Sequence, residues 1–104
     1  GEGKYGFLDI IENYSGTNAS QLSYYSAGMA YYNLNDFENA IKYFEKALCL
    51  DNQFYFAQHN LAQCYEKLNN IDLAIENYSK AEVINLHKFN NTLNNLGNKI
   101  SVLR

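Results

Sequence analysis

Apolar and small residues recur along this chain with the spacing of amphipathic helices, and the pattern repeats after 34 residues. When residues 21–54 are laid over residues 55–88, apolar positions fall on apolar positions and small residues on small residues. The identical pairs are Tyr31 and Tyr65, Leu34 and Leu68, Ala40 and Ala74, Ile41 and Ile75, and Ala47 and Ala81. A period of this length is typical of stacked repeats, in which each unit buries its apolar face against its neighbours.

The periodicity predicts about six helices. We expect them over residues 5–14, 19–33, 37–50, from the turn at 51–52 to about 68, 71–84 and 89–104. Turn residues separate them, and Asp36 is the expected N-cap of the third helix. Asn35 and Asn69 are expected in the turns before the third and fifth helices, and the absence of Pro from the chain weakens the helix stops.

The third and fifth helices each carry an apolar stripe that should face inward. In the third helix the stripe is Ala40, Ile41, Phe44, Ala47 and Leu48, and in the fifth it is Ile71, Ala74, Ile75, Tyr78 and Ala81. In the second helix, Gly28 lies among the aromatic positions of the packing face, where a missing side chain allows close approach of a neighbouring helix. A bulky residue at Gly28 should therefore be costly.

The repeating residues resemble those of the tetratricopeptide repeat (TPR) family. The matching positions are Tyr24, Ala27, Gly28, Tyr31, Ala40, Phe44 and Ala47 in the first unit, and Gln58, Leu61, Ala62, Tyr65, Ala74, Tyr78 and Ala81 in the second. The chain departs from the family at Asn52 and Leu86, where Pro is usual, and at Gln58, where an aromatic is usual and the packing should be thinner.

The resemblance implies an all-α fold, a right-handed superhelical stack of antiparallel helix pairs forming one domain over residues 1–104. Its parts would be a half-repeat or capping helix (5–14), two repeats (21–54 and 55–88) and a partial third repeat or capping helix (89–104). Leu96 and Gly97 support a third unit because they repeat the Leu-Gly pair of the family, one residue later than the offset predicts.

The family's function implies a non-catalytic scaffold that binds a protein or peptide segment, since the first helix of each TPR pair lines a concave groove. The expected groove residues are Leu22, Tyr25, Met29, Tyr32, Phe56, His59, Asn60, Gln63 and Glu66, with the Asn residues of the last helix beyond them. Three exposed aromatics and a Met on one wall would form an interaction patch, with packing against another part of the chain as the alternative.

The groove's composition predicts the chemistry of its ligand. Asn60 resembles one Asn of the TPR clamp that holds acidic chaperone tails, but the basic clamp residues are missing here. Charge-assisted anchoring of a carboxylate is therefore not expected. A neutral to mildly basic segment with apolar anchors suits the wall of Tyr and Met better.

Charge and hydropathy exclude other partners. The net charge is −3 with scattered Lys residues, which argues against nucleic acid, and no apolar run within this chain is long enough to cross a membrane. The compartment is unknown from the sequence. The cytoplasm is favoured, with the periplasm as the alternative if a signal or anchor has been removed.

No catalytic, cofactor or metal site is expected. His59 and His87 are far apart in the repeat, and no nucleophile stands beside a base in a known motif. Cys49 and Cys64 are 15 residues apart with no metal-ligand spacing, so they should be free thiols, with a structural disulfide as the alternative.

A second function remains open, in which the chain is an architectural or oligomerisation segment of a longer repeat protein. The last helix would then self-associate. The residues around Tyr14, Thr17 and the Tyr24–Gly28 run also resemble bacterial envelope TPR proteins that assist assembly in the periplasm.

Overall fold

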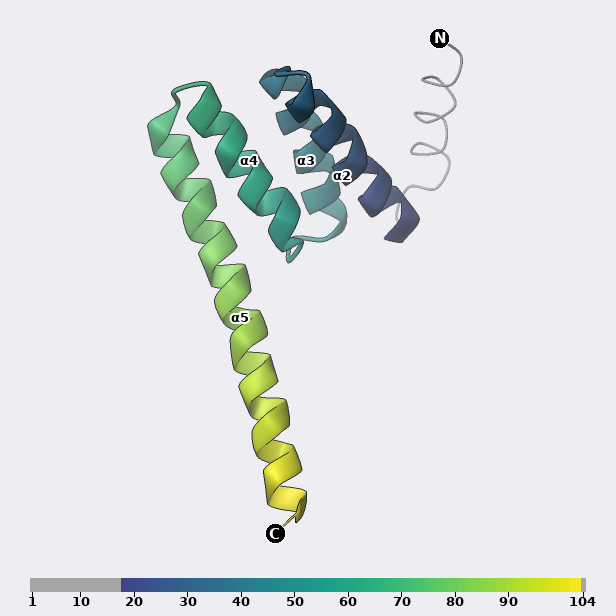
Figure 1. Ribbon diagram of the computed structural model, residues 1–104, viewed down its shortest axis with the longest axis vertical. Coiled ribbons are helices and arrows are strands. Elements are labelled where there is room, and N and C mark those ends of the chain that lie inside the picture. The colour runs from purple at the N-terminus through teal and green to yellow at the C-terminus, as the bar shows by residue number, and fades with distance from the viewer. Residues whose placement is uncertain (1–17, 104) are drawn as a thin grey trace.

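The computed structural model describes the backbone of residues 18–103 and the side chains of residues 19–98. Over this part of the chain the regular elements are four α-helices: α2 (Asn18–Asn33), α3 (Phe37–Leu50), α4 (Tyr55–Lys67) and α5 (Ile71–Leu103). Neighbouring helices run in opposite directions and are joined by short turns, and α5 extends far past the other three (Figure 1). The helix predicted over residues 5–14 lies outside the described residues.

The core lies where α3 packs against α4. Its fully or nearly buried members are Ala40, Phe44, Ala47, Ala57, Leu61 and Cys64. The small residues among them allow two helix backbones to approach, while Phe44 fills the space between them. The inward stripe predicted for α3 is thereby confirmed, since Ile41 and Leu48 also pack against this cluster.

Local signals set the ends of α3. The Asp36 carboxylate accepts a hydrogen bond from the backbone N–H of Asn39 (3.3 Å), which confirms Asp36 as the N-cap. Glu38 in the first turn is placed favourably for the helix dipole. The helix ends at Leu50, and the N–H of Asp51 bonds back to the Ala47 carbonyl.

The turns inside the two helix pairs have the same geometry. Asn35 and Asn69, which are equivalent under the 34-residue offset, both adopt φ of 61°. In each turn, the N–H of the following residue bonds to a carbonyl in the helix before it, that of Tyr31 or Tyr65, at 2.9 Å. This is the left-handed C-terminal cap that Gly usually provides and Asn tolerates. The turns predicted at Asn35 and Asn69 are confirmed.

Gly28 permits the contact between α2 and α3. A Cβ atom built on Gly28 would lie 2.6 Å from two carbon atoms of the Phe44 ring, well inside contact distance. The close approach predicted at this glycine is therefore real, and the group that comes close is the aromatic ring of the neighbouring helix. The equivalence of Gly28 and Ala62 is also confirmed, because both are buried.

The number of helices differs from the prediction of about six, because α5 does not end near Ile84. The chain continues as one helix of 33 residues through the turn expected before residue 89. Two features explain the error. No Pro or Gly stands between Ile71 and Phe89, and the Asn residues that suggested a turn are compatible with a helix when no cap stops it. The right-handed superhelix stays a prediction.

Two residues of the stripe predicted for α5 are not buried. Ile71 is 52% exposed and Ile75 is 60% exposed, whereas Ala74 and Ala81 are buried as expected. In α3 the equivalent residues, Phe37 and Ile41, are partly buried against the core cluster. No helix covers α5 in the same way within residues 18–103, so this side of α5 stays open to solvent.

Gln58 does not thin the packing as predicted. It is 6% exposed, and its amide nitrogen donates to the side-chain oxygen of Asn77 at 2.7 Å. Asn77 in turn donates to the backbone carbonyl of Leu73 at 2.8 Å. The pair joins α4 to α5 with its polar atoms satisfied, which is the condition for burying amides at little cost.

Candidate functional site

The nine predicted groove residues form one face of the first helices of the two pairs, and we call it the α2–α4 face. Leu22, Tyr25, Met29 and Tyr32 come from α2, and Phe56, His59, Asn60, Gln63 and Glu66 come from α4. Four of the α4 residues are the 34-residue equivalents of the four α2 residues. Their spacing of three and four residues places each set along one side of its helix.

A chain of side-chain hydrogen bonds links the two helices across this face. The Tyr25 hydroxyl donates to the Asn60 side-chain oxygen (3.1 Å), and the Asn60 amide nitrogen donates to Gln63 Oε1 (2.8 Å). All three side chains are partly buried. The chain ends at the Gln63 amide nitrogen, for which no hydrogen bond exists within the described residues. This nitrogen is a donor suited to a carbonyl group of a ligand.

The aromatic wall of α2 is more buried than the sequence suggested. The Tyr25 ring lies 5.0 Å from that of Phe54 and 5.7 Å from that of Phe44, between ring centroids. Tyr32 packs edge-on against Phe37, and Met29 also touches the core cluster. The patch of three exposed aromatics and a Met is therefore smaller than predicted, because part of it stabilises the repeat.

The exposed apolar groups of the face lie at equivalent places on the two helices. Leu22 is 55% exposed and Phe56 is 61% exposed. Both precede the polar chain by one helical turn, so each helix presents an apolar side chain first and then the residues around the Tyr25–Asn60 bond. These two residues are the most exposed apolar groups among the nine residues of the face.

Tyr78 of α5 organises the other edge of the face. Its hydroxyl donates to Glu66 Oε1 at 2.7 Å, and its ring lies edge-on to His59 at 5.3 Å between centroids. The Tyr55 ring also stacks on His59, with 5.7 Å between ring centroids. Burial, followed by the hydrogen bond and negative charge of Glu66, raises the pKa of Tyr78 to about 12. The sequence identified Tyr78 only as a packing residue, since nothing in the repeat pattern reports where its hydroxyl points.

The charge on this face is low. None of the 16 residues of α2 is charged, and none of the nine residues of the face is Lys or Arg. The one carboxylate, that of Glu66, is bonded to Tyr78. Burial also raises the pKa of Tyr25, whose hydroxyl bonds from α2 to Asn60 of α4. The face therefore offers apolar contacts and neutral donors and acceptors.

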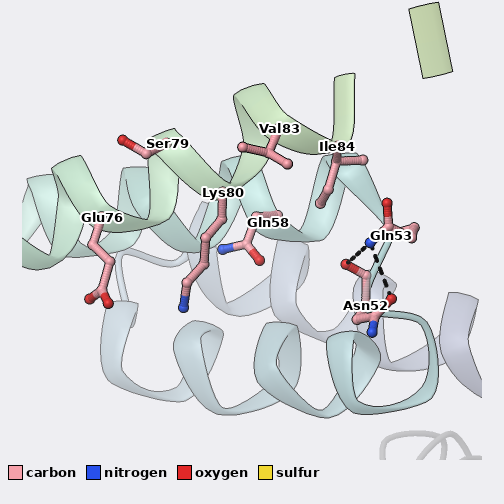
Figure 2. A pocket seen from close by; sticks show the side chains of 8 residues that line it. All are labelled: Asn52, Gln53, Gln58, Glu76, Ser79, Lys80, Val83 and Ile84. Atoms are coloured by element: carbon pink, nitrogen blue, oxygen red, sulfur yellow. Dashed lines mark hydrogen bonds between the residues drawn. The ribbon is translucent and has the colours of Figure 1, made fainter. Parts of the chain in front are cut away.

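A hollow lies away from the α2–α4 face, between α5 and the turn that joins α3 to α4 (Figure 2). It has a volume of about 610 Å³, and Gln58 lies at its centre in the figure. Gln58 and Asn60 are two positions apart, which places them on opposite sides of α4. The hollow holds Lys80 and Glu76, so its charges offset each other, and it shares no residue with the α2–α4 face.

The predictions about metal sites, membrane-spanning helices and the two cysteines concern the described part of the chain. Residues 18–103 contain no cluster of His, Cys, Asp and Glu with the geometry of a metal site. None of the described helices is both long and apolar enough to cross a membrane. Cys49 and Cys64 are free thiols, the first exposed and the second buried, and burial raises the pKa of the Cys64 thiol to about 12.

Comparison with known proteins identifies the repeat. A sequence profile of the tetratricopeptide repeat matches residues 22–54 and 57–85, which is more than half of the chain and agrees with the two units set by the 34-residue offset. The chain belongs to the tetratricopeptide repeat family. Tetratricopeptide repeats are generally non-catalytic scaffolds for protein–protein interaction, and the two repeats of this chain support an interaction scaffold.

The fold also occurs in a solved structure, the crystal structure of MamA, with a TM-score of 0.70 and 23% sequence identity. The similarity covers 80% of this chain and 49% of the MamA chain, so this chain spans about half the length of that protein. At this level of identity the likeness concerns the fold alone. No curated protein sequence matches this chain significantly.

Proposed function

We propose that the α2–α4 face binds a segment of another protein, neutral to mildly basic, that inserts apolar side chains beside Leu22 and Phe56. The observation that carries the proposal is the combination on one face of two exposed apolar groups, a bonded polar centre and no cation. Exposed apolar groups rimmed by polar residues are typical of interaction sites. The polar centre would then orient the segment.

The polar centre favours a ligand that supplies an acceptor. The open donor at the end of the Tyr25–Asn60–Gln63 chain is a neutral amide, which pairs well with a main-chain carbonyl. A carboxylate ligand would gain no charge-assisted bond here, and it would lie near the negative charge of Glu66. The chemistry therefore favours an extended or helical segment without acidic groups at this point.

The test begins with selection of peptides from a random library on the wild-type chain. Affinity is then measured by fluorescence anisotropy for Leu22→Ser/Phe56→Ser and for a matched control, Ile71→Ser/Ile75→Ser. The control removes two Ile side chains of α5 that are 52% and 60% exposed, nearly the same as the 55% and 61% of Leu22 and Phe56. We expect the first pair to weaken binding at least about tenfold and the control to leave it unchanged.

Exposed positions are the right ones to change. Tyr25 and Tyr32 also pack on core residues, so replacing them by Ala would confuse loss of binding with loss of stability. Tyr25→Phe removes only the hydroxyl and tests the polar centre. Equal binding by the Leu22→Ser/Phe56→Ser variant and the wild type would refute the proposed face.

An architectural role is the second candidate, and a specific observation favours it. The side of α5 that carries Ile71 and Ile75 is uncovered, as expected for a repeat that stacks on a further unit. The charge distribution does not distinguish segment binding from an architectural role. Both functions are compatible with a scaffold in the cytoplasm or at the bacterial envelope.

A further inference from the structure

The last part of α5 leaves the body of the molecule as a single helix. Ile84 is the last buried residue, and every described side chain from Asn85 to Asn98 is exposed. Figure 1 shows this part running far below the other helices. Most helical stability in proteins comes from tertiary packing, so a helix without neighbours is held mainly by its own backbone hydrogen bonds. We call residues 85–103 the overhang.

The exposed apolar residues of the overhang have a heptad spacing. They are Leu86, Phe89, Leu93 and Leu96, with exposed fractions of 55%, 58%, 48% and 53%. The intervals are three, four and three residues, and the sequence continues the alternation with Ile100 and Leu103. This is the a and d spacing with which two helices supercoil around each other, and it begins where α5 leaves the body.

The charges near this seam allow identical helices to meet. Residues 83–103 contain no Asp or Glu, and their only full charges are Lys88 and Lys99. The positions flanking the seam over the described side chains are neutral, and they are Asn85, Asn90, Thr92 and Gly97. Two copies of this helix would therefore meet an apolar seam with neutral edges and little like-charge repulsion.

The overhang is poorly suited to fold back as a separate helix and pack on the first part of α5 in the way that α4 packs on α3. In α4 the contact with α3 includes Cys64, which is completely buried. The register of the Leu-Gly pair, Leu61-Ala62 in α4 and Leu96-Gly97 in the overhang, places Lys99 at the position of Cys64. A Lys at a fully buried position is costly unless it is paired. The heptad seam has no such conflict.

We propose that the overhang pairs with the overhang of a second copy of this chain through the seam of Leu86, Phe89, Leu93 and Leu96. The two bodies would then be held at the ends of a short two-stranded coil. The seam lies outside the α2–α4 face, so the proposal does not depend on the proposed function. Because the seam spans only about one and a half heptads, association should be weak and concentration-dependent.

Light scattering on the whole chain from about 10 µM to about 1 mM tests the pairing. The wild-type mass should rise from 12.0 kDa toward twice that value. Leu93→Gln/Leu96→Gln keeps good helix formers while removing the apolar seam, and it should weaken dimerisation at least about tenfold. The matched control, Asn94→Gln/Asn95→Gln, changes exposed positions off the seam and should associate like the wild type.

Every outcome decides the proposal. A wild-type mass that stays at 12.0 kDa over the whole range overturns it, and so does a mass that rises past two chains. Equal dimerisation by Leu93→Gln/Leu96→Gln and the wild type would show that the dimer does not form through the proposed seam. If the control loses association as well, residues outside the seam are responsible and the seam is again wrong. Loss of peptide binding by the Leu22→Ser/Phe56→Ser variant would not affect this result.

Discussion

Gly28 and Gly97 are equivalent in the Leu-Gly pattern but have opposite surroundings. The Phe44 ring occupies the space where a Gly28 side chain would begin, whereas nothing lies within 4 Å of the corresponding position at Gly97. Ala is preferred to Gly in a helix by roughly 1 kcal/mol when space allows it. The two positions thus separate the effect of packing from that of helix propensity.

We expect Gly28→Ala to lower the free energy of unfolding by about 1–3 kcal/mol, because the Phe44 ring must move out of the core. Gly97→Ala should leave stability unchanged or raise it. Urea unfolding followed by circular dichroism measures both, at a low concentration where the chain is monomeric. A Gly28→Ala variant as stable as the wild type would show that the ring does not contact the glycine.

The Tyr78–Glu66 hydrogen bond makes stability depend on alkaline pH. Folding raises the Tyr78 pKa from 10.0 to about 12, so the folded state keeps this proton when the unfolded state has lost it. The contribution is complete below pH 10 and is lost as the pH rises from about 10 to about 12. We expect the free energy of unfolding to fall over this range, and to fall less steeply in Tyr78→Phe.

Urea midpoints of the wild type and Tyr78→Phe between pH 9 and pH 12 provide the comparison. Burial also raises the pKa of Tyr25, Tyr32 and Tyr65, so some alkaline loss should remain in the variant. Identical slopes in the two proteins would mean that Tyr78 does not titrate differently in the folded state.

At the scale of the helices, the Gln58–Asn77 pair joins α4 to α5 inside the repeat. Gln58→Leu should cost about 1–3 kcal/mol, because the Asn77 oxygen would lose its donor in a buried place. Gln58→Leu/Asn77→Leu should recover much of the loss, since two apolar side chains leave no polar atom unpaired. A double-mutant cycle by urea unfolding measures the coupling, and strictly additive effects would contradict the pairing.

The helices and their caps were largely predictable, because short-range signals set them. The 3.6-residue periodicity and Asp36 placed α3 at its observed bounds. The end of α5 was not predictable in the same way, because the missing Pro left only Asn residues to suggest a stop, and Asn is tolerated in both helices and turns. The predicted burial of Ile71 and Ile75 was wrong for a related reason. Burial of a helix face depends on another helix that covers it, and the spacing of apolar residues does not show whether one does.

The exposure of two predicted groove residues followed from the sequence, whereas the contacts around them did not. The offset assigned Leu22 and Phe56 to equivalent places, and the structure leaves both exposed. The hydrogen bond of Tyr25 to Asn60, 35 residues away, cannot be inferred from spacing, because it depends on the angle between two helices. Gln58 was interpreted as a weak point for the same reason, since its partner lies 19 residues away on another helix.

At the scale of the whole molecule, two surfaces of different chemistry are separated along the chain. The α2–α4 face is uncharged apart from Glu66 and lies in the packed body, whereas the overhang carries its apolar residues on one exposed helix. A scaffold with this arrangement can hold a ligand on the body and a second copy at the overhang. Changing one surface should therefore leave the other active.

The most direct test of the account is to map a selected peptide onto the chain by the chemical shifts of its backbone amides in NMR. The account predicts that the largest changes occur at the α2–α4 face, around Leu22 and Tyr25 of α2 and around Phe56, Asn60 and Gln63 of α4. Large changes confined to α5, or to the hollow around Gln58, with the α2–α4 face unaffected, would contradict it.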